Sequence, residues 1–138
     1  MQKTTSTELP PKFIMFGEDD LDEEDFLKEV FYSIDPSFSL IFVNNGRKLI
    51  ADLEQIPDSG LPCLIVLDYN MPELNGGEIL KTLKQNNRYD PIPKIVWSTS
   101  GSEIYKKLCF ESGANDYVIK PSNIKELEGI AHHLLSFC

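Results

Sequence analysis

Groups that could do chemistry follow four of the five short apolar runs in the sequence. They are, in chain order, Glu18-Asp19-Asp20, Asp68, Ser98 and Lys120. Each has an ordinary explanation on its own, since an acid after a strand is usually a helix cap or a solvated loop charge. If the runs are parallel strands of one sheet, however, their carboxyl ends share one edge, where open α/β sheets bind ligands. The sequence therefore predicts that carboxylates, a hydroxyl and an ammonium meet there.

The chemistry expected of such a cluster follows from its charges. Carboxylates about 5 Å apart repel one another by roughly 3 kcal/mol per pair at an effective dielectric of 20, so a cation is needed for balance. A few hard oxygen ligands with room for water suit Mg²⁺. A lysine and a hydroxyl suit phosphoryl oxygens, and a carboxylate is a competent nucleophile toward phosphorus. The cluster indicates metal-assisted phosphoryl transfer onto an aspartate.

The elements that must position these groups alternate between two periods. Apolar runs occupy residues 12–16, 38–43, 63–67, 94–97 and 117–119, and helical periodicity is found in residues 21–34, 47–56, 75–83, 102–111 and from 122 onward. Repeated strand–helix units imply parallel pairing with right-handed crossovers. Strands without polar interruptions are typical of a sheet covered on both faces. We expect an α/β fold, a three-layer α/β/α sandwich of five parallel strands and five helices, with Gly113 ending the fourth helix and Ser122 capping the last.

Composition and charge narrow the classes of function. The 138 residues predict one domain, residues 12–138, after a polar N-terminal tail of residues 1–11. The net charge of −9 argues against nucleic acid or an anionic membrane as the main partner. No apolar run approaches the roughly 18 residues of a membrane span, and the first residues do not form a secretory signal. We therefore expect a cytoplasmic protein.

The three cysteines are odd in number and widely spaced, which disfavours a disulfide framework or a zinc cluster. Cys63 and Cys109 lie in apolar segments, so we expect both to be reduced thiols in the core. Cys138 is expected to be exposed.

The most specific motif is found in residues 67–76, LDYNMPELNG. It resembles the segment D-x-x-M-P-x-x-x-G that holds the phosphoacceptor of receiver domains in bacterial two-component response regulators. Ser98, Tyr117 and Lys120 follow Asp68 by 30, 49 and 52 residues, which are the intervals of the family's hydroxyl, switch aromatic and lysine. The resemblance extends from about residue 12 to residue 136 and implies a CheY-like sheet of strand order 2-1-3-4-5.

A narrower likeness concerns two short segments. The E-D-D of the first acidic turn and the S-T-S after the fourth strand are similar to the corresponding segments of the short, phytochrome-associated response regulators. This subgroup consists of stand-alone receiver domains.

The resemblance implies a role for each residue around the phosphoryl group. Asp68 is then the phosphoacceptor, and Ser98 and Lys120 contact the phosphoryl oxygens. Ser98 and Tyr117 form the switch: phosphorylation draws the Ser98 hydroxyl inward, and Tyr117 moves into the space that is vacated. The peptide bond between Lys120 and Pro121 is expected to be cis.

The resemblance also implies a Mg²⁺ site. Asp19 and Asp68 would bind the ion directly, Glu18 would bind it through water, and the backbone carbonyl of Asn70 would supply a further ligand. Receiver domains have two acids at the first turn, whereas this chain has three. Aligning the pair with Glu18 and Asp19 fits the preceding strand, and a pair that includes Asp20 is the alternative.

The function that follows is two-component signal transduction. The chain would accept a phosphoryl group from a histidine kinase or a histidine phosphotransfer protein, with no turnover of an external substrate. It would signal to a downstream protein by contact, through the face formed by the fourth helix, fifth strand and fifth helix, which is also the expected surface for a homodimer.

Three other functions share part of this pattern. A pseudo-receiver would keep the fold and act by protein contact without phosphorylation, and this is the main alternative. A haloacid-dehalogenase-type phosphatase needs a second aspartate two residues after the nucleophile, where this chain has Asn70. A flavodoxin needs a phosphate-binding turn after the first strand, and the acids found there would repel a phosphate.

Overall fold

The structure of the protein is a computed structural model that describes residues 12–138, so the predicted tail, residues 1–11, lies outside the described residues. The strands are β1 (Phe13–Gly17), β2 (Ser39–Val43), β3 (Leu64–Asp68), β4 (Lys94–Ser98) and β5 (Asp116–Ile119). The helices are α1 (Leu21–Ile34), α2 (Gly46–Gln55), α3 (Gly76–Lys84), α4 (Glu103–Glu111) and α5 (Ile124–Leu135), with the short 3-10 helices η2 (Asp58–Gly60) and η3 (Asn87–Tyr89).

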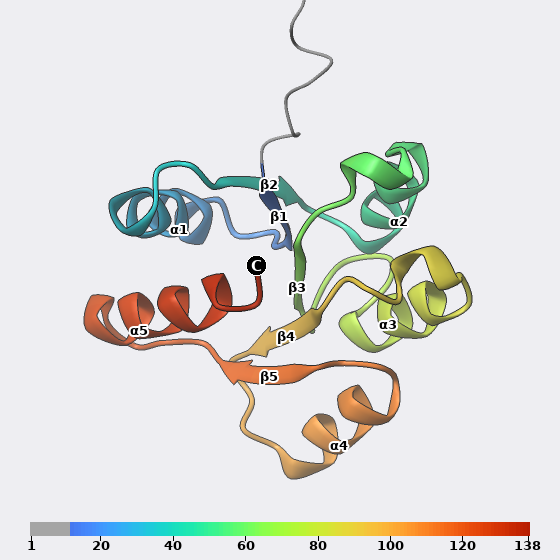
Figure 1. Cartoon of the computed structure of the whole chain (residues 1–138). Helices are drawn as coiled ribbons and strands as arrows, with labels where there is room; N and C mark the ends of the chain where they lie inside the picture. The colour runs from blue at the N-terminus through green and yellow to red at the C-terminus, as the bar shows by residue number, and fades with distance from the viewer. Residues whose placement is uncertain (1–11) are drawn as a thin grey trace, which may run out of the picture.

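The sheet has the expected topology. Its strand order is β2-β1-β3-β4-β5, and every neighbouring pair is parallel. Helices α1 and α5 cover one face, and α2, α3 and α4 cover the other, which gives three layers (Figure 1). Asp68 at the end of β3 pairs with Trp97, and Ser98 at the end of β4 pairs with Ile119. The residues that follow these strands therefore emerge side by side on one edge.

Successive residues of the central strands face opposite layers. Ile14 and Phe16 of β1 belong to the apolar cluster that contains residues of α1 and α5, and Met15 belongs to the cluster that contains residues of α2 and α3. All three side chains are at most 2% exposed. Because both faces of the sheet are buried, the strands read as continuous apolar runs instead of alternating with polar residues.

The helix termini follow local sequence rules, with one correction. The N-caps are Asp20, Asn45, Asn75, Ser102 and Asn123. The prediction that Ser122 caps α5 is wrong by one residue: the Asn123 side chain accepts the Glu126 N–H at 2.8 Å. Ser122 instead donates its own N–H and hydroxyl to the Glu126 carboxylate. Asn123 and Glu126 therefore both make capping hydrogen bonds at the N-terminus of α5. Gly113, with φ +115°, follows α4 and ends it as expected.

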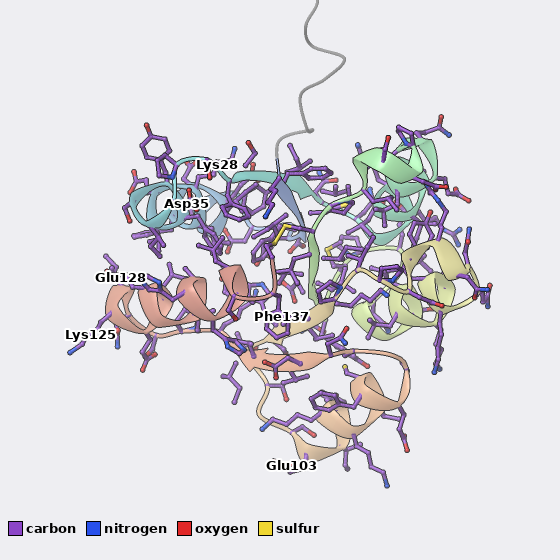
Figure 2. The ribbon with its side chains drawn as sticks, viewed as in Figure 1. Lys28, Asp35, Glu103, Lys125, Glu128 and Phe137 are labelled. Atoms are coloured by element: carbon purple, nitrogen blue, oxygen red, sulfur yellow. A yellow bond between two sulfur atoms is a disulfide. The ribbon has the colours of Figure 1, made fainter. Side chains whose placement is uncertain are left out.

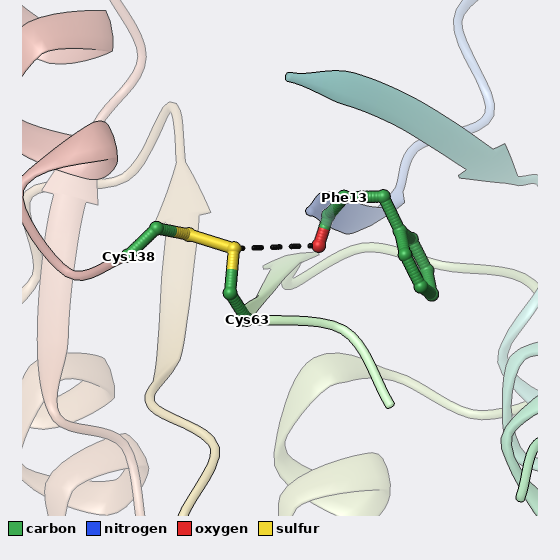
Figure 3. Close-up of a disulfide and its surroundings, with 3 residues drawn as sticks. All are labelled: Phe13, Cys63 and Cys138. Atoms are coloured by element: carbon green, nitrogen blue, oxygen red, sulfur yellow. Dashed lines mark hydrogen bonds between the residues drawn. A yellow bond between two sulfur atoms is a disulfide. The ribbon is translucent and has the colours of Figure 1, made fainter. Parts of the chain in front are cut away.

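The cysteine predictions hold for one residue only. Cys109 is a buried free thiol, but Cys63 and Cys138 form a disulfide, so the expectations for these two were wrong (Figure 3). They are 75 residues apart in the sequence, with Cα atoms 5.3 Å apart. The fold explains this proximity, because α5 runs back along the sheet and returns the chain to the edge where β3 begins (Figure 1).

None of the described helices has both the length and the apolar character that crossing a bilayer requires.

Candidate functional site

Three carboxylates meet at the carboxyl edge of the sheet. Glu18 and Asp19 follow β1, and Asp68 ends the neighbouring strand β3. One oxygen from each residue lies within 4.8 Å of the other two, as the strand ends predicted. Glu18 and Asp68 are buried, with 1% and 5% of their surface exposed, whereas Asp19 is exposed. The cluster therefore has a buried base and an open side.

The third acid of this turn has another task. The Asp20 side chain caps α1 by accepting the N–H groups of Asp22 at 2.9 Å and Glu23 at 3.4 Å. An aspartate in this position stabilises the start of a helix. The sequence left open whether Asp20 or Glu18 joins the acidic pair, and the structure brings Glu18 into the cluster and Asp20 to the helix.

The Lys120 ammonium lies among the carboxylates. Its Nζ donates to Asp68 Oδ2 at 2.9 Å, to Glu18 Oε1 at 3.1 Å and to Glu23 Oε2 at 3.2 Å. The backbone anchors this loop, because the Lys120 N–H donates to the Ser98 carbonyl at 2.8 Å. A positive charge at this point offsets part of the repulsion between the acids.

The expected cis bond before Pro121 is absent: every peptide bond of the described residues is trans. The trans isomer of an X–Pro bond is favoured intrinsically by about 0.5–1 kcal/mol. The Lys120 ammonium reaches Asp68 and Glu18 with this bond trans, so the position of the lysine does not require the cis form.

The proton affinity of Glu18 is strongly perturbed. Burial, together with hydrogen bonding to Glu23 and Asp68 and the charge of Asp68, raises the pKa of Glu18 to about 9, and the nearby Lys120 only partly opposes this. The Trp97 indole N–H at 3.3 Å and the Asp19 N–H at 3.0 Å fix the two oxygens of the side chain. Burial and the neighbouring acids therefore favour the protonated form of Glu18 in the metal-free protein.

Lys120 shows the complementary effect. Burial alone would lower its pKa, but the hydrogen bond and charge of Asp68, and then those of Glu18, outweigh burial and raise the pKa above its usual value. Its side chain is only 12% exposed, and the ammonium lies 5.3 Å from the centre of the Trp97 ring. Lys120 thus remains positively charged throughout the neutral pH range.

The remaining expected residues surround this centre. The Ser98 hydroxyl oxygen accepts the Ser100 N–H at 3.1 Å, and the Tyr117 hydroxyl donates to the Ser100 carbonyl at 2.7 Å. Both side chains are buried, and both are attached to the loop between β4 and α4. The Asn70 N–H donates to Asp68 Oδ1 at 2.9 Å and so orients the carboxylate, while the Asn70 side chain is exposed.

Two residues of the site were missed from the sequence. Glu23, in the first turn of α1, contacts Lys120, and Trp97 contacts Glu18. Helical side chains tilt toward the N-terminus of the helix, so an acid three residues after the N-cap could have been expected near this edge. Trp97 directly precedes Ser98 on a strand beside β3, which was the available signal for its position.

The donor set fits a divalent cation. Carboxylate oxygens are the hard ligands that Mg²⁺ and related ions prefer. Glu18, Asp19 and Asp68 supply three carboxyl groups close enough to share one ion. Because Asp19 is exposed, the cluster is open to solvent on this side.

The fold and the site define a receiver domain. Residues 14–132 match the model of the response regulator receiver domain, and the chain belongs to this family. Its function is therefore that of a receiver domain in two-component systems, whose members are phosphorylated by histidine kinases. The comparisons do not favour the pseudo-receiver alternative.

The relatives also confirm the likeness to the phytochrome-associated subgroup. Response regulator Rcp1 of Synechocystis sp. is 33% identical over 131 residues, which span 93% of this chain and 89% of Rcp1. The crystal structure of the Mn(2+)-bound form of Rcp1 has a TM-score of 0.79 at 32% identity, covering 92% of this chain and 94% of that one. The phosphorylated cyanobacterial phytochrome response regulator RcpA has a TM-score of 0.80 at 27% identity, covering 92% and 96%.

Proposed function

We propose that Asp68 accepts a phosphoryl group and that the rest of the site supports this transfer. The observation that carries the proposal is the Lys120 ammonium, which contacts the buried carboxylates of Asp68 and Glu18 beside an open acidic turn. A carboxylate oxygen of Asp68 attacks phosphorus, and the bond from phosphorus to the donor breaks. The donor keeps the bonding electrons, and a histidine donor leaves as neutral imidazole once protonated.

The neighbouring groups have distinct tasks in this proposal. Lys120 stays protonated and binds an oxygen of the transferred group, as its raised pKa supports. The Ser98 hydroxyl, which now accepts the Ser100 N–H, turns to donate to another oxygen. The Tyr117 hydroxyl also contacts Ser100, by donating to its carbonyl. A rotation of Ser98 therefore changes the hydrogen bonding of the residue that holds Tyr117. This shared partner supports Ser98 and Tyr117 as the switch.

We propose Mg²⁺ as the resident ion, held by Asp19, Asp68, Glu18 through water and the backbone carbonyl of Asn70. The charge of the bound ion offsets the negative charge that phosphoryl oxygens bring to the acidic site. Mn(2+) is present in the solved structure of the relative Rcp1, and Mg²⁺ prefers the same kind of oxygen ligand. Glu18 must lose its proton for the site to carry its full negative charge.

The proposed partners follow from this role. The phosphodonor is a histidine kinase or a histidine phosphotransfer protein acting in the cytoplasm, and residues 12–138 form the receiver domain. The output is a contact with a downstream protein, or with a second copy of the chain, through α4, β5 and α5. The exposed apolar side chains Ile104 and Leu108 of α4 and Ile119 of β5 support this surface. We expect no nucleic acid or membrane partner and no turnover of an external substrate.

The test is phosphorylation by a small donor. The protein is incubated with acetyl phosphate and Mg²⁺, and its intact mass is followed over time. We expect the wild type and an Asp52→Asn control to gain one phosphoryl group, and an Asp68→Asn variant to gain none. Asp52 is a matched control because it pairs with Lys48 on α2, away from the site. Phosphorylation of Asp68→Asn at the wild-type rate would contradict the proposal.

A further inference from the structure

A covalent link lies at the edge of the sheet opposite to the acidic site. Cys63 directly precedes β3, and Cys138 lies three residues beyond the end of α5. Their disulfide joins these two segments, and the Cα atoms are 5.3 Å apart (Figure 3). The ion pairs of Lys120 lie a few residues before the N-terminus of α5. The disulfide lies just beyond its C-terminus.

The disulfide fixes a segment that otherwise has few attachments. After α5, the Phe137 N–H donates to Leu134 O at 3.1 Å and the Cys138 N–H to Leu135 O at 3.0 Å, which are contacts within the same helix end. Figure 2 shows Lys125 and Glu128 pointing away from α5, whereas Phe137 lies near the middle of the molecule. Phe137 and Cys138 are only partly buried against the apolar cluster. The covalent bond to Cys63 is thus the strongest attachment of this segment to the sheet.

Cys63 has a hydrogen-bond acceptor close to its sulfur. Its Sγ lies 3.4 Å from the carbonyl oxygen of Phe13, and its backbone N–H donates to the same oxygen at 3.0 Å (Figure 3). A reduced Cys63 therefore has a hydrogen-bond acceptor for its thiol without moving. Loss of the bond therefore leaves Cys63 with a hydrogen-bond partner and removes the covalent attachment of Cys138.

The bond is also accessible. Both Cys63 and Cys138 are partly exposed, whereas Cys109 is buried and burial raises the pKa of its thiol. Thiol–disulfide exchange requires a thiolate to reach one sulfur, and exposed disulfides are the more labile ones. The disulfide is thus less deeply buried than the free thiol of Cys109.

We propose that Cys63 and Cys138 form a reversible thiol–disulfide site that controls the attachment of the α5 end to the sheet. A dithiol reductant opens it. One thiolate of the reductant attacks a sulfur and breaks the S–S bond to give a mixed disulfide, and the second thiol of the reductant displaces the protein sulfur. The products are two cysteine thiols and the oxidised reductant, so the protein gains two electrons and two protons. This device does not depend on phosphorylation.

Reduction should have one local and one global effect. Locally, the amides at the end of α5 and in residues 136–138 should exchange with solvent about tenfold faster or more, because this segment opens without unfolding the rest. Globally, opening a disulfide typically raises the unfolding equilibrium constant roughly 30- to 1,000-fold, and we expect an effect of this order or larger. Amides of β1 and β3 should change only through the global effect.

The test is a redox titration of the whole chain. The protein is equilibrated in reduced and oxidised dithiothreitol at several ratios, quenched in acid, alkylated under denaturing conditions and weighed. We expect one two-electron transition from one free thiol to three, with the midpoint unchanged in a Cys109→Ala control. Hydrogen exchange should show a faster α5 end in the reduced wild type and in Cys138→Ser, but not in oxidised Cys109→Ala.

Four outcomes would overturn the proposal. Three free thiols at every ratio would mean that the disulfide does not form, and one free thiol at every ratio would mean that it does not open. A disulfide that links two chains would exclude the intramolecular site. Equal exchange of the α5 end in both redox forms would remove its control of this segment.

Discussion

The metal-free protein should lose stability as the pH rises through the neutral range, and Glu18 should be the cause. Its pKa is raised from 4.5 to about 9, chiefly by burial and then by the neighbouring acids Glu23 and Asp68. A raised carboxyl pKa means that the folded state binds the proton more tightly than the unfolded state. The resulting stabilisation is fully present below pH 4.5 and is lost progressively as the pH rises to about 9.

The size of the effect follows from these two pKa values. Within the window, the folded state holds one more proton than the unfolded state, so the free energy of unfolding falls by about 1.4 kcal/mol per pH unit. Between pH 5.5 and pH 8 the expected loss is about 3 kcal/mol. This is a large share of the 5–15 kcal/mol that is typical of a domain, so the change should be measurable without any partner.

Two other shifted acids act outside this window. Hydrogen bonds from Ser37 lower the pKa of Asp35, and hydrogen bonds from Ser122 lower the pKa of Glu126. A lowered carboxyl pKa gives a stabilisation that is lost as the pH falls through the folded-state value. Both groups titrate at or below their ordinary values of 3.8 and 4.5, so they do not alter the slope above pH 5.5.

The assay is urea unfolding in EDTA at several pH values, followed by the fluorescence of Trp97. This is the only tryptophan of the sequence, it is buried, and it contacts Glu18. The control is Glu18→Gln, whose amide oxygen can still accept from Lys120 and Trp97 but does not titrate. Saturating Mg²⁺ should flatten the wild-type slope, because a cation favours the ionised carboxylate. A wild-type slope equal to that of Glu18→Gln would refute this reasoning.

Three further outcomes are expected. Asp19→Asn should weaken Mg²⁺ binding about tenfold or more by calorimetry, whereas Asp20→Ala should leave the affinity nearly unchanged and lower stability by about 1 kcal/mol through loss of the helix cap; the reverse pattern would exchange the two roles. Lys120→Met should destabilise the metal-free protein by about 3–5 kcal/mol in urea unfolding, because it leaves the buried carboxylates without their cation, and an effect below 1 kcal/mol would contradict this. Ser98→Ala should slow phosphorylation and leave the Tyr117 ring resonances unchanged by beryllofluoride, which should shift them in the wild type.

Most of the fold could be predicted from residue patterns. The apolar runs predicted all five strands, and each predicted end lies within about two residues of the end in the structure. The prediction works because buried parallel strands have few polar interruptions. The order of the strands came from the resemblance, since alternating strands and helices do not determine which strands are neighbours. Gly113 was predicted correctly, because a left-handed residue after a helix favours glycine.

The centre of the site was predictable for a topological reason. Strand ends in a parallel sheet lie on one edge, so residues 50 apart, such as Glu18 and Asp68, could be expected to meet. The task of Asp20 could not be assigned, since an acid at this turn can cap the helix or join the cluster with equal ease. Glu23 was missed because its contact with Lys120 depends on where α1 lies relative to β5.

The disulfide at the opposite edge of the sheet was less predictable from the sequence. The apolar context of Cys63 indicated a core thiol, and nothing near Cys138 in the sequence pointed to a partner 75 residues away. The pairing depends on the length of α5 and on its direction along the sheet, which brings Cys138 to the start of β3. Composition rules for disulfides count cysteines, and they do not detect a single pair that only the tertiary fold brings together.

The central claim is that Asp68 carries the phosphoryl group, and locating the acyl phosphate tests it most directly. The chain is phosphorylated in Mg²⁺ and treated with borohydride, which reduces an aspartyl phosphate to homoserine, and the peptides are then sequenced by mass spectrometry. We expect homoserine at position 68 in the phosphorylated protein. We expect it at no position in a control that is not phosphorylated but is treated with borohydride in the same way. Homoserine at Asp19 or Asp20, or its absence after a measured gain of phosphate, would contradict the claim.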